Sequence, residues 1–200
     1  MPAKTFSEQL HTWLISKEPK TLQGLIAHFS EKSFAILFLI LMAIPALPLP
    51  TGGVTHVFEI INMLLALELI AGLDKVWLPK RWRRLNLPLK LQNSTFPFLI
   101  KTVHKVERLS RPRFRIVFKN AVAIRIIGLL IFILTLFAFL APPFSGLDTL
   151  PSLGVVLISL AMVLDDFILF LLGLVVGSMG IGLVIGIGHT LINLISTRLL

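Results

Sequence analysis

The chain has 200 residues, of which 56% are hydrophobic and only 14% are charged, and its mean hydropathy is +0.90. Soluble domains carry roughly a quarter charged residues, so this composition excludes an ordinary soluble domain and indicates an integral membrane protein. The absence of cysteine excludes a disulfide framework, a thiol nucleophile and a thiolate metal site.

The net charge of +9 is concentrated beside the apolar segments. Of the 19 Lys and Arg residues, 14 lie between Lys75 and Arg125, four precede the first apolar run, and Arg198 follows the last. Basic residues in short loops beside membrane spans stay on the cytoplasmic side and suit anionic headgroups. We therefore expect a cytoplasmic N-terminus and membrane lipids as partners. Nucleic acid is not expected, because no binding module accompanies the charge.

Residues 1–32 are polar and amphipathic, without the apolar core of a cleavable signal peptide. The first apolar run is therefore expected to act as its own insertion signal. Apolar residues recur at spacings of three and four in two short stretches, which predicts two amphipathic helices at the membrane surface. They are Phe6, Leu10, Trp13 and Leu14 in the first stretch, and Leu22, Leu25, Ile26 and Phe29 in the second.

Five apolar segments follow the N-terminal region, and they predict an all-α, polytopic membrane protein with about five to six helical segments. They cover residues 34–47, 54–73, 122–141, 150–164 and 167–188. A full crossing needs about 20 residues, so the first and the fourth are short. Short segments bounded by Pro and Gly indicate either tight hairpins or re-entrant half-helices.

The chain also repeats a pattern, in which an apolar run, a Pro/Gly break and a second apolar run ending in acid follow one another. The breaks are PLPTGG, with Pro48, Pro50, Gly52 and Gly53, and APPFSGLDTLP, with Pro142, Pro143 and Gly146. Interrupted hydrophobic segments in two halves point to a transporter-like site at the repeat interface. We therefore predict two hairpin repeats, 33–74 and 121–166. The alternative is that helix–Pro–helix hairpins arise independently in polytopic proteins.

Ionisable groups within apolar segments are the first candidates for a site, because each is unfavourable in lipid unless it is paired or hydrated. His56, Glu59 and Asn62 recur every third residue and share a helix face, whereas Glu68 lies nearly opposite. All four are candidates for a polar cavity that holds a cation, a proton or a polar headgroup. In the alternative interpretation, His56 and Glu59 satisfy each other and Glu68 lies at the interface.

Asp165 and Asp166 separate the last two apolar runs and complete the candidate intramembrane site. One of them is alternatively an N-cap of the following helix. For the other we consider pairing with Arg81, Arg111 or Arg125.

The basic connector, residues 75–120, is expected on the cytoplasmic side, with an interfacial helix that ends at Ser110 before Pro112. Its positive charge predicts a patch for anionic lipid or for a partner protein. The patch consists of Lys80, Arg81, Arg83, Arg84, Arg111 and Arg113.

The C-terminal segment, residues 167–200, is rich in glycine and either crosses the membrane or bends at Gly177–Gly180 and returns. Gly173, Gly177, Gly182 and Gly186 give two small-xxx-small spacings, which allow close helix packing and suggest a homodimer contact. No hydrolase, phosphate-loop or metal motif is present, so no enzyme activity, metal or other cofactor is expected.

Several motifs together resemble the bacterial ExoD family of exopolysaccharide-synthesis membrane proteins. They are PALPLPTGGVTHVFEI, GLDKVWLPKRW, VERLSRPRF and LAPPFSGLDTLPSLGVVLISLAMVLDDFILFLLGLVVG, in the order typical of the family. The chain departs from that pattern at Glu59, where a small residue is expected, at Glu68, where Gln is commoner, and at Phe167, where Gly is commoner. The resemblance implies a multi-pass bacterial inner-membrane protein that works with polysaccharide-synthesis proteins.

Two functions fit these observations. The first is a small transporter or flippase-like protein for an ion or a lipid-linked intermediate, with the intramembrane acids at its site. The second is a non-transporting scaffold or regulator of a polysaccharide-synthesis complex that works through the basic connector.

Overall fold

The computed structural model describes residues 5–29, 32–47, 54–73, 75–77, 79, 86, 93, 96–110, 114, 116–142 and 145–199. Within these ranges the protein is all-α, as expected, and contains no β-strand apart from one isolated bridge between Thr21 and Asn86. The helices are α1 (Phe6–Ile15), α2 (Leu22–His28), α3 (Ser33–Met42), α4 (Val54–Ala71), α6 (Phe96–Leu109), η3 (Val117–Lys119), α7 (Ala121–Leu140), α8 (Thr149–Leu164) and α9 (Phe167–Leu199).

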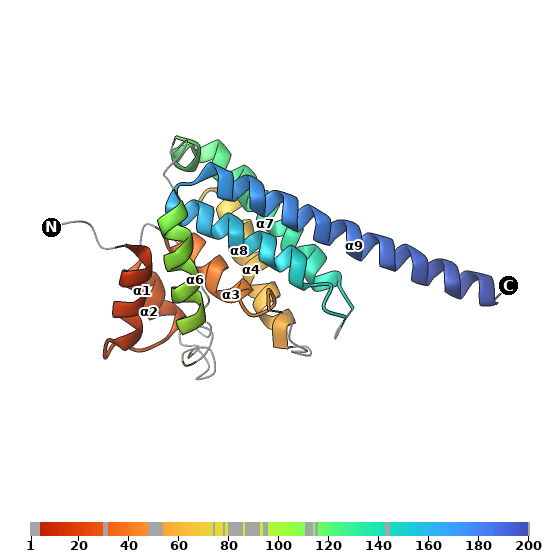
Figure 1. Ribbon diagram of the computed structural model, residues 1–200, viewed down its shortest axis with the longest axis horizontal. Coiled ribbons are helices and arrows are strands. Elements are labelled where there is room, and N and C mark those ends of the chain that lie inside the picture. The colour runs from red at the N-terminus through yellow and green to blue at the C-terminus, as the bar shows by residue number, and fades with distance from the viewer. Residues whose placement is uncertain are drawn as a thin grey trace.

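Helices α3, α4, α7, α8 and α9 form the bundle, and α1, α2 and α6 gather at one end of it (Figure 1). In the bundle, α4 packs on α7, α3 on α8, and α8 on α9. The C-terminal part of α9 projects beyond the other helices, as Figure 1 shows.

Two helices of the described chain are long and apolar enough to cross a membrane, namely Ala121–Leu140 and Phe167–Ile187. Helices α3 and α8 are also apolar but shorter. The five apolar segments expected from the sequence therefore form helices near their expected bounds, although length and composition mark only two of them as full spans.

Helix α3 is the centre of the core, because all ten of its residues are buried. A helix that is apolar on every side has no face suited to water and is stable only when other helices surround it. With 10 residues it is about 15 Å long, roughly half the thickness of the hydrocarbon layer.

Glycines set the spacing of α8 and α9. A Cβ added at Gly154 would lie 2.6 Å from the Gly177 Cα and 2.9 Å from the Gly173 carbonyl oxygen. A Cβ at Gly180 would overlap the ring of Pro151. The run from Gly177 to Gly180 therefore serves close helix approach, and α9 continues through it without the bend that we considered.

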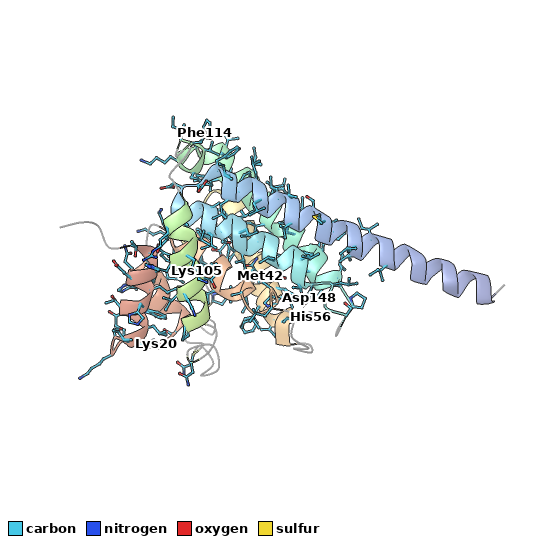
Figure 2. All side chains as sticks on the ribbon, viewed as in Figure 1. Lys20, Met42, His56, Lys105, Phe114 and Asp148 are labelled. Carbon is cyan, nitrogen blue, oxygen red and sulfur yellow. The ribbon has the colours of Figure 1, made fainter. Side chains whose placement is uncertain are left out.

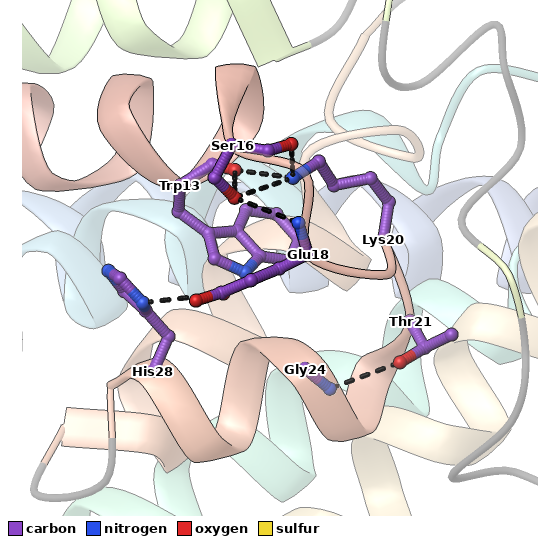
Figure 3. Close-up of polar contacts among 7 residues, drawn as sticks. All are labelled: Trp13, Ser16, Glu18, Lys20, Thr21, Gly24 and His28. Atoms are coloured by element: carbon purple, nitrogen blue, oxygen red, sulfur yellow. Dashed lines mark hydrogen bonds and ion pairs between the residues drawn. The ribbon is translucent and has the colours of Figure 1, made fainter.

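Lys20 fixes the end of α1. Its Nζ donates to the carbonyl oxygens of Trp13 and Ser16, and lies 4.8 Å from the centre of the Trp13 ring (Figure 3). A cation at the C-terminal end of a helix binds the free carbonyl groups and opposes the helix dipole. Burial lowers the pKa of Lys20, and the neighbouring Glu18 carboxylate partly offsets this. The contact holds the loop between α1 and α2 against the buried Trp13 side chain.

Candidate functional site

Three polar residues occupy one buried face of α4, as their spacing predicts. Glu59 and Asn62 are fully buried, and the His56 side chain is 27% exposed. His56 Nδ1 lies 3.0 Å from Glu59 Oε2, one helical turn further on. The pair therefore lies where α4 begins, with the imidazole between the carboxylate and the surface.

Helix α7 supplies the other wall of this cluster. Asn62 Nδ2 donates to Thr135 Oγ1 over 2.8 Å, and the Thr135 hydroxyl donates to the Ile131 carbonyl oxygen over 2.8 Å. The rings of His56 and Phe139 lie 5.1 Å apart. Residues early in α4 therefore contact residues late in α7, which makes the two helices antiparallel.

Asp148, which precedes α8, joins the cluster from the second hairpin. Its charge interacts with both His56 and Glu59. Burial raises the pKa of Asp148, and its backbone hydrogen bonds and the nearby imidazole partly oppose that rise. Figure 2 shows His56 and Asp148 beside each other, at the opposite end of the bundle from α1. Asp148 and Thr135 were not predicted as site residues, although Asp148 lies within the second Pro/Gly break.

Three buried oxygens of this cluster accept no hydrogen bond from the residues that the structure describes, namely Glu59 Oε1, Glu59 Oε2 and Asn62 Oδ1. Glu59 Oε2 has His56 Nδ1 3.0 Å away, which leaves Glu59 Oε1 and Asn62 Oδ1 as the two without a nearby donor in the described chain. Buried polar atoms are almost always paired, because an unpaired one loses its hydration without compensation. Both atoms are oxygens, so what they lack is a proton donor or a cation. In the described chain, no three His, Cys, Asp or Glu side chains lie close enough to hold a metal ion.

Thr135→Val tests whether α7 holds Asn62 in place. Valine has the same shape but cannot accept the hydrogen bond, which leaves the Asn62 amide buried and unpaired. We expect the free energy of unfolding to fall by about 1–3 kcal/mol. The check is denaturant unfolding of the purified protein in detergent, with the conservative Thr135→Ser variant, which keeps the hydroxyl, remaining near wild type.

Glu68 does not belong to this cluster, which corrects the interpretation that placed it in the same cavity. It lies about 13 Å further along α4, where its Oε2 accepts a 2.8 Å hydrogen bond from the Trp77 backbone N–H. Glu68 therefore ties the segment after α4 to the helix end, in agreement with the alternative interfacial role.

Asp165 and Asp166 also lie away from the cluster, at the turn between α8 and α9. Asp165 has left-handed backbone angles, and its Oδ2 lies 3.6 Å from Lys32 Nζ. Asp166 accepts hydrogen bonds from the Ser110 hydroxyl, over 2.8 Å, and from the Ile168 N–H, over 3.0 Å. Asp166 is thus the N-cap of α9, and within the described residues Asp165 pairs with Lys32.

Of the arginines considered for that pairing, Arg81 and Arg111 lie outside the described residues. Arg125 lies elsewhere, because its guanidinium group covers Gly72 at the C-terminal end of α4. Gly72 has φ +82°, and a cation at the C-terminal end of a helix opposes the helix dipole.

Asp166→Ala is expected to lower the free energy of unfolding by about 1–2 kcal/mol, because it removes the cap of α9 and the Ser110 contact. Thermal unfolding in detergent measures the change. Asp166→Asn keeps a capping oxygen and should recover most of the loss; equal destabilisation by both variants would contradict a capping role.

Some predicted site residues lie outside the described residues. From the breaks they are Pro48, Pro50, Gly52, Gly53 and Pro143, and from the basic patch Lys80, Arg81, Arg83, Arg84, Arg111 and Arg113. Two break residues are described. The Pro142 carbonyl oxygen accepts hydrogen bonds from Ser145, and Gly146 turns the chain toward α8 with φ +69°.

The predicted dimer glycines divide into two pairs. Gly173 and Gly177 face α8 within the same chain, and a Cβ at Gly177 would also lie 2.5 Å from the Leu134 side chain. A Cβ at Gly182 or Gly186 would meet no atom within 4 Å. Internal packing therefore uses the first pair, and a dimer contact stays a prediction for the second.

Comparisons with known proteins found one matching family and related chains. The profile of the family "Exopolysaccharide synthesis, ExoD" matches residues 6–186. An uncharacterized protein of Synechocystis is 25% identical over 145 residues, which cover 72% of this chain and 68% of that protein. Protein ExoD of Rhizobium meliloti is 28% identical over 149 residues, which cover 73% of this chain and 61% of the Rhizobium protein. No solved structure matches.

Proposed function

The chain belongs to the ExoD family of exopolysaccharide synthesis, and we propose that it is a small bacterial inner-membrane transporter that moves a proton or another small cation. The proposed transport involves no catalytic step on the cation. The cluster of His56, Glu59, Asn62 and Asp148 is the proposed ion site. Among the substrates considered, a small cation is favoured over a lipid-linked intermediate because Glu59 and Asn62 are fully buried.

One observation carries this proposal, namely that a fully buried carboxylate keeps an oxygen without a donor among the described residues. An ionisable group inside apolar helices is unfavourable, so its presence calls for a bound partner or a proton. The neighbouring unpaired Asn62 oxygen adds a second acceptor on the same face. His56 is partly exposed and 3.0 Å from Glu59, so it is placed to pass a proton between the surface and the carboxylate.

The arrangement of helices supports a site between two hairpins. In the proposed repeat, α3 and α4 correspond to α7 and α8. A two-fold rotation that exchanges the hairpins puts α8 in the place of α4 and α3 in the place of α7. The contact of α4 with α7 then has a counterpart in the contact of α8 with α3, and both contacts are present. Short apolar helices next to the two breaks, such as α3, are what re-entrant segments require. We expect the N-terminus on the cytoplasmic side, because four lysines precede the first apolar run.

Purified protein in liposomes tests the proposal. With a pH-sensitive dye inside and an imposed potential, we expect proton or cation flux above that of protein-free liposomes. Absence of flux for every monovalent cation tried, in vesicles that contain correctly folded protein, would overturn it.

A further inference from the structure

A second site of a different kind lies between α1 and α6, at the end of the bundle away from the ion site. Glu107 on α6 accepts hydrogen bonds from the backbone N–H and the hydroxyl of Ser7 on α1, and so holds the two helices together. Beside this contact they leave an open groove of about 800 Å³.

One rim of the groove is strongly basic. Lys101, Lys105 and Arg108 follow one another at spacings of four and three on α6, and all three are exposed. Like charges at these spacings repel each other and destabilise an isolated helix. Within the described residues, none of the three has a carboxylate within ion-pair distance. An anion bound in the groove would relieve this repulsion.

The other groups along the groove do not neutralise that rim. His11 from α1 and His104 from α6 also line it, and both are exposed. The acid on its wall is Glu8, which is engaged in the capping box of α1 with Thr5. Cationic side chains therefore outnumber the acid around this groove.

Apart from the hydroxyl groups of Ser7 and Thr12, the remaining lining is apolar, which distinguishes the groove from a site for a free ion. Leu14 and Ile15 of α1 face Pro97 and Ile100 of α6, and Ile15 is 69% exposed. An apolar floor beneath a cationic rim matches a ligand that has an anionic head on a hydrocarbon chain.

The position of the groove agrees with a lipid ligand. Figure 1 shows α6 running across the direction of α8 and α9, at the bundle end where α9 begins. A helix with this orientation beside apolar helices lies along the membrane surface, at the level of the headgroups.

We propose that the groove between α1 and α6 binds the phosphate headgroup of an anionic membrane lipid, with Lys101, Lys105 and Arg108 as the phosphate contacts and the apolar floor against the start of the acyl chains. This binding site is independent of the transport function proposed above, because its residues lie outside the four-residue ion site.

Native mass spectrometry of the full chain in neutral detergent tests the proposal. The probes are phosphatidic acid, diacylglycerol with the same acyl chains, and inorganic phosphate. We expect the wild type to retain phosphatidic acid, to retain little diacylglycerol, and to keep the lipid in millimolar inorganic phosphate. The variant K101Q/K105Q/R108Q should retain about tenfold less phosphatidic acid.

The matched control is K17Q/K75Q/K119Q, which removes the same charge from three other exposed lysines. It should retain phosphatidic acid like wild type. Equal loss in both triple variants, or no loss in either, would overturn the site, as would equal retention of diacylglycerol. Displacement of the lipid by inorganic phosphate would assign the groove to a soluble phosphate and also overturn it. Because all six side chains are exposed, neither variant should unfold at a lower temperature than the wild type.

Discussion

Glu59→Gln is expected to reduce cation flux into proteoliposomes by at least about tenfold while the protein stays folded. Glutamine has nearly the same shape as glutamate, but it can neither release a proton nor carry a negative charge for a cation. At full burial the neutral amide is also less unfavourable than the carboxylate, so the free energy of unfolding should stay level or rise. The measurement pairs dye-detected flux with thermal unfolding of the same preparation.

The control for this experiment lies on the same helix. Glu68→Gln makes the identical chemical change at a residue whose carboxylate binds the Trp77 backbone, away from the cluster. It should leave flux within about twofold of wild type, because an amide oxygen also accepts that hydrogen bond. Equal loss of flux in both variants would exclude Glu59 as the specific ion-binding residue.

The same cluster also predicts an effect at His56. If the imidazole passes protons to Glu59, His56→Phe should lower flux less than Glu59→Gln does, because water can still reach the partly exposed position. Flux measured across a pH series should follow a different profile in this variant than in the wild type. An unchanged pH profile would restrict the site to the carboxylate.

Gly154→Ala is expected to cause the largest loss of stability, on the order of 2–3 kcal/mol or a fall in melting temperature of about 5 °C or more. The new methyl group would lie 2.6 Å from the Gly177 Cα and 2.9 Å from its backbone nitrogen. Backbone atoms cannot rotate away as a flexible side chain can, so α8 and α9 must separate. That movement weakens the contact on which α9 depends for its place in the bundle.

Gly182→Ala is the matched control, because it adds the same methyl group to α9 where no atom lies within 4 Å. In a helix interior, alanine is about 1 kcal/mol more stabilising than glycine. This variant should therefore melt at or above the wild-type temperature. Fluorescence-detected size exclusion after heating compares the two. A loss of stability at Gly182 as large as at Gly154 would show that position 182 packs against something outside the single chain.

The sequence alone determined the local properties of this protein. Its apolar runs predicted helices at nearly the observed bounds, for example 54–73 against Val54–Ala71, since a run of apolar residues between breaks specifies a helix without reference to the rest of the chain. The three-residue spacing also placed His56, Glu59 and Asn62 on one face, because the helical period fixes that relation. The interfacial helix in the connector was predicted to end at Ser110, and α6 ends at Leu109, although it begins earlier than expected.

Only the tertiary structure decided which of these groups meet. Thr135 and Asp148 lie more than 70 residues from Asn62 in the sequence, and no local pattern encodes which helix faces which. Glu68 and Asp166 have the same chemistry as Glu59, yet the chain uses them to bind backbone groups at helix ends. The glycines of the last segment were ambiguous in the same way, because glycine permits both a helix bend and a close helix contact. In the structure α8 packs against Gly173 and Gly177, and α9 is one continuous helix through this region.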